Sequence, residues 1–355
     1  MTNRVVSFKR YLRDLYSKIK KVLVQFFSSS PWLSRVYYAL FSTAFQDENW
    51  TVLQGMRMYW LEGNINDDVH YGLRRNIHRL EKALLMRPRK AVFAQDYIRE
   101  TVEWYGECLD GEHASAPEEL GWAQDVLEEY FSVVEPTDIV QKAKDIYYSL
   151  PTCRSASVKN IPYRYGQIDR SVERYETLLE LARQRKSVRW YLDKPVPRED
   201  IDKAISLAVY SPSACNRQPF EYRILDDPAL LRFVAAQVPG IHGFDKNLPG
   251  LVVIVGKLRA YFHERDRHLI YIDASLSAMA FMLALESLGI SSCGINWPDQ
   301  DKLHTMIRRV LNLQSDERVI LLIAYGYADP DGLVAFSKKK NVRQMRKYNN
   351  EDLTE

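Results

Sequence analysis

The stretch RKSVRWYLDKPVPREDIDKAISLAVYSPSACNRQPFEYRIL (185–225) contains the two segments on which the fold assignment of this chain depends. It opens with three cations and a hydroxyl within five residues. It closes on SPSACNRQPF (211–220), where small and amide side chains stand between two prolines. Such residues are common in surface turns. A turn is therefore one reading of the second segment, and a rigid loop that holds amides and backbone groups against a planar ligand is the other.

The first segment is compatible with an anion site. Alternate residues of an extended chain project to one side, so Arg185, Ser187 and Arg189 can converge on one anion at the end of the preceding helical pattern. Guanidinium groups match the geometry of a phosphate, and a hydroxyl adds a neutral donor. A solvated helix end is the ordinary alternative, because cations there also favour the helix dipole.

The order of several elements resembles the FMN-dependent nitroreductase superfamily. Its members begin with an RxSxR-like element, followed by a proline, a helix, and a PS(A/S)xNxQPW loop that leads into a strand. The resemblance continues in the apolar helix at 273–288, in its exit LGISSCGI (288–295) and in the strand ILLIAYGY (320–327). It covers roughly residues 170–345, about half of the chain. Phe220 stands where the family more often has Trp, which preserves an aromatic ring.

The resemblance implies an FMN site shared between two subunits of a homodimer. The phosphate and ribityl chain would be held by Arg185, Lys186, Ser187 and Arg189. The loop that packs against the isoalloxazine ring would come from the partner subunit and consist of Pro212, Ser213, Ala214 and Asn216. Gln218 and Pro219 would fix this loop.

Two further segments belong to the implied site. Gly294 and Ile295 would present backbone near the reactive edge of the flavin. In FSKKKNVRQMRK (336–347), Lys338 and Lys340 would reach the phosphate, and a solvated basic run is the alternative reading. Cys215 beside the ring fits a small apolar residue better than redox chemistry.

The implied function is that of an FMN-dependent oxidoreductase. Hydride would pass by a ping-pong mechanism between NAD(P)H or a substrate and a small organic acceptor, and the protein would supply binding, orientation and a positive field. No catalytic triad is then required. The alternative is a degenerate flavin-binding or scaffold protein of a membrane-associated biosynthetic complex without redox turnover.

Other chemistries lack their signatures. The sequence has no GxGxxG after a strand, no GxxxxGK[ST] and no GxSxG. His263 and His268 are five residues apart and do not form a zinc pair, so no metal is expected.

The four cysteines lie far apart without a CxxC pair, which favours a reducing compartment. A net charge of +3 gives no support for nucleic-acid binding, and no run of about 18 uninterrupted apolar residues is present.

The fold class is expected to be α+β, with a nitroreductase-like α/β sandwich preceded by an all-helical N-terminal domain. Helical spacing dominates residues 1–150, residues 151–170 read as a linker or wrapping segment, and mixed helices and strands fill residues 171–355. Strands are expected at 248–256 and 317–329. A long helix is expected at 273–290, with Asp273 as its N-cap and Gly289 as its stop.

The N-terminus is basic as well as apolar. Residues 1–40 contain eight Lys or Arg against the single acid Asp14, a net charge of +7. The pattern fits an amphipathic helix that could lie on an anionic membrane or, alternatively, pack on its own domain with a basic face in water. A cleaved signal peptide is not expected. We therefore predict a cytoplasmic protein; peripheral contact at the inner membrane face through residues 1–30 and a helix packed on its own domain stay open as alternatives.

Overall fold

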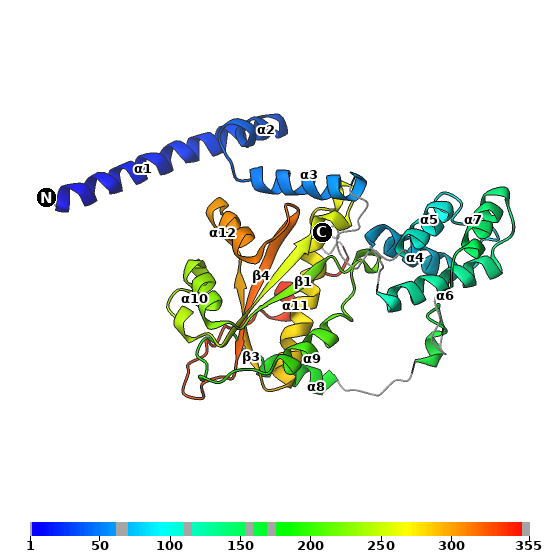
Figure 1. The fold of residues 1–355 in the computed structure, drawn as a ribbon. Coiled ribbons are helices and arrows are strands. Elements are labelled where there is room, and N and C mark those ends of the chain that lie inside the picture. The colour runs from blue at the N-terminus through cyan, green and yellow to red at the C-terminus, as the bar shows by residue number, and fades with distance from the viewer. Residues whose placement is uncertain (1, 62–69, 110–115, 153–158, 169–174, 350–355) are drawn as a thin grey trace. The chain divides into compact units, whose positions relative to one another are not determined.

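The computed structural model describes residues 2–61, 70–109, 116–152, 159–168 and 175–349. It is an α+β structure, as the sequence predicts (Figure 1). The helices before residue 150 are α1 (Thr2–Phe27), α2 (Pro31–Leu40), α3 (Gln46–Leu61), α4 (Tyr71–Leu84), α5 (Ile98–Leu109), α6 (Pro117–Val133) and α7 (Asp138–Ser149). Those after it are α8 (Tyr175–Gln184), α9 (Arg198–Ala208), α10 (Pro228–Gln237), α11 (Leu269–Ser287), α12 (Asp301–Leu311) and the short α13 (Val342–Met345).

A four-stranded sheet is the centre of the C-terminal half. Its strands are β1 (Phe220–Leu225), β2 (Gly250–Lys257), β3 (Ser291–Asn296) and β4 (Glu317–Gly326), in the order β1-β2-β4-β3. The strands expected at 248–256 and 317–329 are confirmed. β3 was not expected, because SSCGIN lacks the apolar β-branched run that marks a buried strand. Its position at the sheet edge explains that composition.

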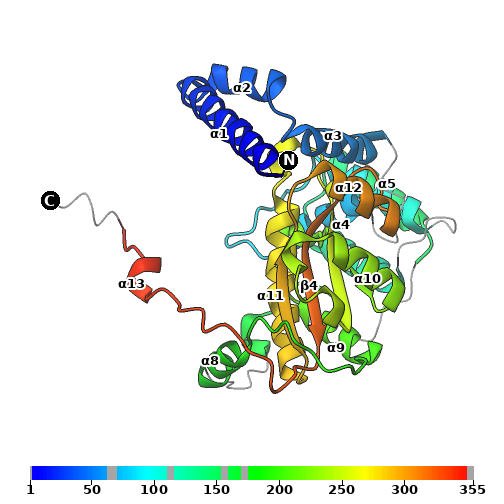
Figure 2. The same cartoon turned by 90° about the vertical axis from the view of Figure 1, so that its left-hand side faces the viewer.

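Helices cover both faces of the sheet. In Figure 2, β4 lies between α11 and α10, and every residue of β2 is buried. Alanines allow α11 to approach α9 closely, and Phe281 fills the space toward the strands. The shared core includes Ala204, Ala208, Ala274, Ala278 and Phe281, together with Val252, Ile254 and Ile323 of the sheet.

One expectation about α11 is wrong. The helix begins four residues before Asp273, which is therefore not its N-cap; the buried Asp273 carboxylate instead accepts a hydrogen bond from the amide of Ala214 at 3.0 Å. The predicted stop is confirmed, since Gly289 follows the C-cap Leu288 with a φ of 73°. By length and composition, Glu264–Ser287 could also cross a membrane, and one face of α11 packs in the core described above.

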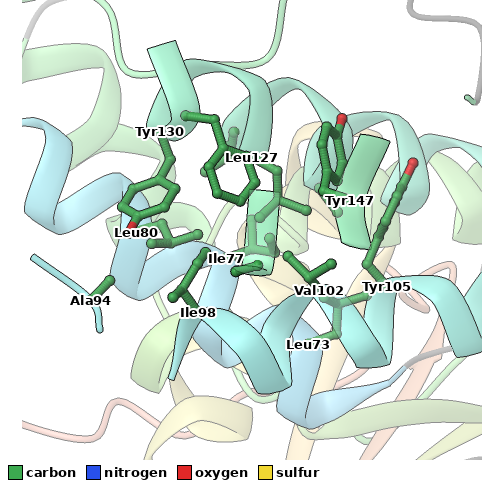
Figure 3. Close-up of a cluster of buried hydrophobic side chains, with 14 of the residues drawn as sticks. Leu73, Ile77, Leu80, Ala94, Ile98, Val102, Tyr105, Leu127, Tyr130 and Tyr147 are labelled. Atoms are coloured by element: carbon green, nitrogen blue, oxygen red, sulfur yellow. The ribbon is translucent and has the colours of Figure 1, made fainter. Parts of the chain in front are cut away.

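Helices α4 to α7 form a bundle with its own core. Apolar residues at helical spacing on α4, such as Leu73, Ile77 and Leu80, meet Ile98 and Val102 of α5 (Figure 3). Tyr130 and Tyr147 contribute from α6 and α7. This burial accounts for the helical pattern that the sequence shows in this region.

The chain divides into two compact units. One unit contains residues 1–65, 257–267 and 298–318; the other contains residues 66–256, 268–297 and 319–355. The bundle α4–α7 thus belongs to the same unit as the sheet, whereas α3 groups with segments from the C-terminal half. A boundary at residue 150 and a linker at 151–170, part of which lies outside the described residues, stay predictions.

In the first unit, α3 is held by later segments of the chain. Gly55 lies so close to the turn at Leu258 that an added Cβ would stand 2.6 Å from the Leu258 Cβ. Asp47 accepts hydrogen bonds from Arg308 and from the buried Arg318, at 2.6 and 2.8 Å. Burial alone would raise the Asp47 pKa, but the Arg308 contact and neighbouring charges outweigh it and the pKa is lowered.

Candidate functional site

The two basic segments singled out in the sequence line one cavity of about 400 Å³. From α8 and the segment after it come Ala182, Arg183, Arg185, Lys186, Ser187 and Arg189. From the segment after β4 come Ala335, Phe336, Ser337, Lys338 and Lys339. Residues about 150 positions apart in the sequence therefore face the same space. Figure 2 shows the second segment, in red, running from the sheet past α8.

Backbone hydrogen bonds attach the segment after α8 to the edge of the sheet. The amide of Val188 donates to the carbonyl of Ser292 in β3 at 3.1 Å, and Ser187 forms a parallel bridge with Ser292. Further along, Tyr191 bridges Ala328, and its amide donates to Oδ1 of Asn247 at 2.6 Å. The buried side chains of Val188 and Tyr191 anchor the segment. Ser187 and its basic neighbours are thus held on a rigid support.

The cavity is strongly positive. Among the residues that the structure describes, its lining includes six cationic side chains and no carboxylate. Nε of Arg185 is buried and has no hydrogen-bond partner within the described ranges, which is costly unless an acceptor is present. Glu286, near the end of α11, has a raised pKa because it is buried, although the charges of Arg185 and Lys186 act in the opposite direction. A phosphate would provide the acceptor that Arg185 lacks and balance the surplus of positive charge.

Gly294 and Ile295 lie in β3 beside this segment but do not line the cavity. The Ser292 carbonyl points outward to Val188, and backbone direction alternates along a strand, so the peptide groups of Gly294 face the same open edge. Those of Ile295 face β4 by the same alternation, and its side chain is buried against Gly240. Of the two, Gly294 can offer backbone to a ligand at this edge.

The loop formed by residues 212–218 lies elsewhere and is fixed by several contacts. The amide of Gln218 donates to Oγ of Ser213 at 3.1 Å, and its side-chain Nε2 donates to the carbonyl of Val209 at 2.8 Å. Ala214 is held by Asp273 near the start of α11. Pro212, Ser213, Ala214, Asn216 and Gln218 are thus together in one ordered loop, but none of them lines the cavity.

The cavity and the loop lie at opposite ends of α11. Asp273 contacts the loop, whereas Glu286 is influenced by Arg185 and Lys186. Thirteen residues of helix separate them, which corresponds to about 20 Å. A single small ligand in the cavity of one chain would therefore not contact the loop of that chain.

The structure adds residues that the sequence analysis did not select. Arg183 and Lys339 line the cavity, and Lys340 does not. Arg183 belongs to the same basic run as Arg185, so the run itself was a usable signal. Arg74 of α4, which contacts the loop, carried no such signal because its partners are more than 140 residues away.

No group of three or more His, Cys, Asp or Glu side chains that could hold a metal ion occurs in the ranges that the structure describes. Cys108, Cys215 and Cys293 are free thiols, and burial raises the pKa of Cys293. The described site is thus built from cations, hydroxyls and backbone groups.

The C-terminal half is similar to proteins of known families. Residues 182–241 and 235–327 match the model of the nitroreductase family. The chain is 25% identical over 169 residues to a Methanothermobacter thermautotrophicus protein provisionally named an NADH dehydrogenase/NAD(P)H nitroreductase, covering 45% of this chain and 81% of that protein. It is 23% identical over 210 residues to the nitrobenzene nitroreductase of Ectopseudomonas oleovorans, covering 45% and 91%.

Among solved structures, an FMN-dependent nitroreductase from Clostridium difficile R20291 is 27% identical to this chain. The match covers 50% of this chain and 94% of the other, with a TM-score of 0.38.

Proposed function

We propose, from the premise that residues 182–327 form a nitroreductase-family region, that this protein is an FMN-dependent oxidoreductase. The family match and the nitroreductase relatives support an oxidoreductase. The observation that carries the FMN proposal is the cavity in which Arg185, Ser187, Arg189 and Lys338 meet. Its volume lies within the range of small-molecule sites, and its lining suits a phosphate.

Within this proposal each group of residues has a separate task. Arg185, Lys186, Ser187 and Arg189, together with Lys338, would hold the phosphate and the ribityl chain. The outward peptide groups of Gly294 would meet the flavin at the sheet edge. When bound, FMN would supply the hydride-accepting centre, between NAD(P)H or a substrate and a small organic acceptor. The protein would then contribute binding, orientation and positive charge.

The separation of cavity and loop supports a homodimer. Because about 20 Å of α11 lies between them, the loop at 212–218 would complete the site of a partner subunit. α11 offers a surface for such a partner, since Ile272, Leu276 and Met279 are 48, 46 and 41% exposed on one helical stripe. Exposed apolar stripes of this kind mark interaction surfaces. The C-terminal segment adds exposed Leu333 and Phe336.

The test of the proposal is the flavin content of the purified protein. We expect one FMN per subunit, identified by chromatography after heat release, which loses its visible absorbance when NADPH or the substrate is added anaerobically. FMN that NADPH does not reduce would indicate another electron donor. A chain that binds no flavin even after reconstitution would contradict the proposal and favour a scaffold role without redox turnover.

A pair of arginine variants tests the site itself. Arg185→Ala should weaken FMN binding at least about tenfold, because a charge-assisted hydrogen bond is lost. Arg198→Ala is the matched control. It removes an equal charge from an exposed ion pair with Asp226, outside the cavity, and should leave FMN binding unchanged. Equal occupancy in both variants would contradict the phosphate assignment.

A further inference from the structure

Arg74, near the start of α4, reaches from the helical bundle to the loop at 212–218. Its Nε donates to the backbone oxygen of Asn216, and its Nη2 donates to Oε1 of Gln218 at 2.9 Å. The side chain is only 13% exposed. Low exposure strengthens hydrogen bonds that involve a charged donor. The contact between Arg74 and the loop is therefore a largely buried interaction.

The same guanidinium is fixed from the bundle side by α6. Nη1 of Arg74 donates to Oε2 of Glu119, and Cζ lies 5.5 Å from the centre of the Trp122 ring. The Trp122 indole in turn donates to Glu81 of α4 at 3.0 Å. A planar guanidinium sends donors in several fixed directions, which a lysine ammonium on a flexible stem does not match. Arg74 can therefore link two helices to the loop at once.

The loop requires such support because part of its backbone is in an unfavourable region. Cys215, Asn216 and Gln218 have φ values of 53°, 51° and 49°. Residues other than glycine occupy this left-handed region at a free-energy cost, and they stay there only when surrounding contacts hold them. Contacts from Asp273 and Val209 fix two points of the loop. Arg74 fixes the two positive-φ residues on either side of Arg217.

We propose that Arg74 is a positioning residue for the flavin-contacting loop, and that the bundle α4–α7 is a working part of the active site. The contact of the loop with flavin rests on the proposed function, whereas the contact of Arg74 with the loop does not. Any movement of α4 would displace Arg74 and, with it, the two groups that it binds, which are the backbone carbonyl of Asn216 and the side-chain amide of Gln218. The bundle would thus set the loop conformation, and with it the affinity for FMN and the rate of turnover.

Hydrogen exchange of the full-length protein measures the loop directly, with or without flavin. In Arg74→Ala, the backbone amides of Ser211 and of residues 213–218 should exchange at least about tenfold faster, since a hydrogen bond to a charged group is lost. Arg74→Lys keeps the charge but loses the planar set of guanidinium donors, so it should restore only part of the protection of the loop amides against exchange. Arg79→Ala is the control on the same helix, because Arg79 contacts Asp96 and Tyr97 within the bundle. It should leave loop exchange unchanged.

A double-mutant cycle separates this link from general damage to the bundle. Gln218→Ala removes the acceptor on the loop and leaves the Arg74–Glu119 pair in place. If the two residues act through one contact, Arg74→Ala combined with Gln218→Ala should accelerate loop exchange less than the product of the single effects. Multiplicative effects would overturn the link. If Arg74→Ala fails to fold, Arg74→Lys takes its place in the cycle.

Flavin binding and kinetics then test the consequence for the site. Arg74→Ala should lower FMN affinity and kcat together, with partial rescue by Arg74→Lys. Arg185→Ala should lose FMN, and its loop should exchange no faster than that of the flavin-free parent. If the parent protein binds no flavin but the loop of Arg74→Ala still exchanges faster, the role of Arg74 in holding the loop stands and the proposed function fails. Unchanged loop exchange in Arg74→Ala would overturn the inference, whatever the flavin content.

Discussion

The amide of Val188 donates to the carbonyl of Ser292 at 3.1 Å, and this bond places the basic segment after α8 beside the edge strand β3. The candidate phosphate site and the outward backbone of Gly294 therefore share one rigid support. A ligand whose phosphate is bound at the candidate phosphate site would extend along the backbone of Gly294. The segment after β4 completes the cavity with Lys338 and Lys339.

The position of Lys338 leads to a prediction about phosphate recognition. Lys338→Ala should weaken FMN binding several-fold, because a cation that faces the cavity is lost. Riboflavin, which lacks the phosphate, should bind equally to the variant and the parent. Lys340→Ala is the control, since Lys340 does not line the cavity. Titration by flavin fluorescence measures the affinities of the three proteins for both flavins, and a loss of riboflavin binding in Lys338→Ala would contradict a phosphate role.

The exposed stripe on α11 predicts how the protein assembles. Leu276→Asp places a charge where we expect a partner copy and should convert a dimer into monomers. FMN should be lost at the same time, because the loop at 212–218 would no longer reach the site of a partner. Phe233→Asp is the control, as Phe233 is equally exposed on α10. Analytical ultracentrifugation measures the change, and a parent protein that is strictly monomeric would contradict the prediction.

His70 predicts an acid-sensitive contribution to stability. Its buried imidazole accepts a hydrogen bond from the amide of Leu73 through Nδ1, and burial lowers its pKa to about 4. Between about pH 6.5 and 4 the unfolded chain binds a proton that the folded chain does not. Stability should therefore fall as the pH falls through this interval, by up to about 3 kcal/mol.

The matched variant for this prediction is His70→Asn, which retains an N-cap acceptor but does not titrate. Urea unfolding at several pH values compares the two proteins. The loss between pH 6.5 and 4 should be smaller in the variant, and parallel pH profiles would contradict the role of His70.

The Asp47 cluster predicts that α3 contributes to the stability of its unit. Asp47→Ala would leave the buried Arg318 without one of its carboxylate partners, and we expect a loss of about 3 kcal/mol. Glu103→Ala breaks an exposed pair with Arg99 and should change the free energy of unfolding by less than about 1 kcal/mol. Denaturant unfolding distinguishes the two. Equal small effects would show that α3 is not held by this cluster.

The predicted amphipathic helix is present as α1, and its membrane contact is testable. Leu15, Ile19, Val22 and Phe26 form an exposed apolar stripe, and Lys20 and Lys21 are exposed as well. We propose binding to anionic vesicles, strengthened by apolar burial and by about 1 kcal/mol for each basic residue near the surface. Ile19→Glu with Val22→Glu should reduce sedimentation with phosphatidylserine vesicles. Unchanged sedimentation would favour a helix that packs on its own protein.

The sequence by itself determined most of the elements and the side chains of the candidate site. Helical periodicity located α4, α6 and α9, and β-branched apolar runs located β2 and β4. Both are local signals that burial on one or both faces imposes on a chain. The basic residues at 185–189 suit an anion site by their side chains, and the family resemblance added Lys338 and Lys340, of which Lys338 lines the cavity. The chemical type of each side chain is known from the sequence and does not depend on how the chain packs.

Only the tertiary structure decided which residues meet. β3 escaped prediction because an edge strand needs little apolar character, and α11 began earlier than expected because Asp273 serves the loop rather than the helix end. The separation of cavity and loop along α11, and the reach of Arg74 to Gln218, arise from packing between segments far apart in the chain. Such contacts leave no periodic trace, since each depends on a single side chain and on the geometry of the elements that carry it.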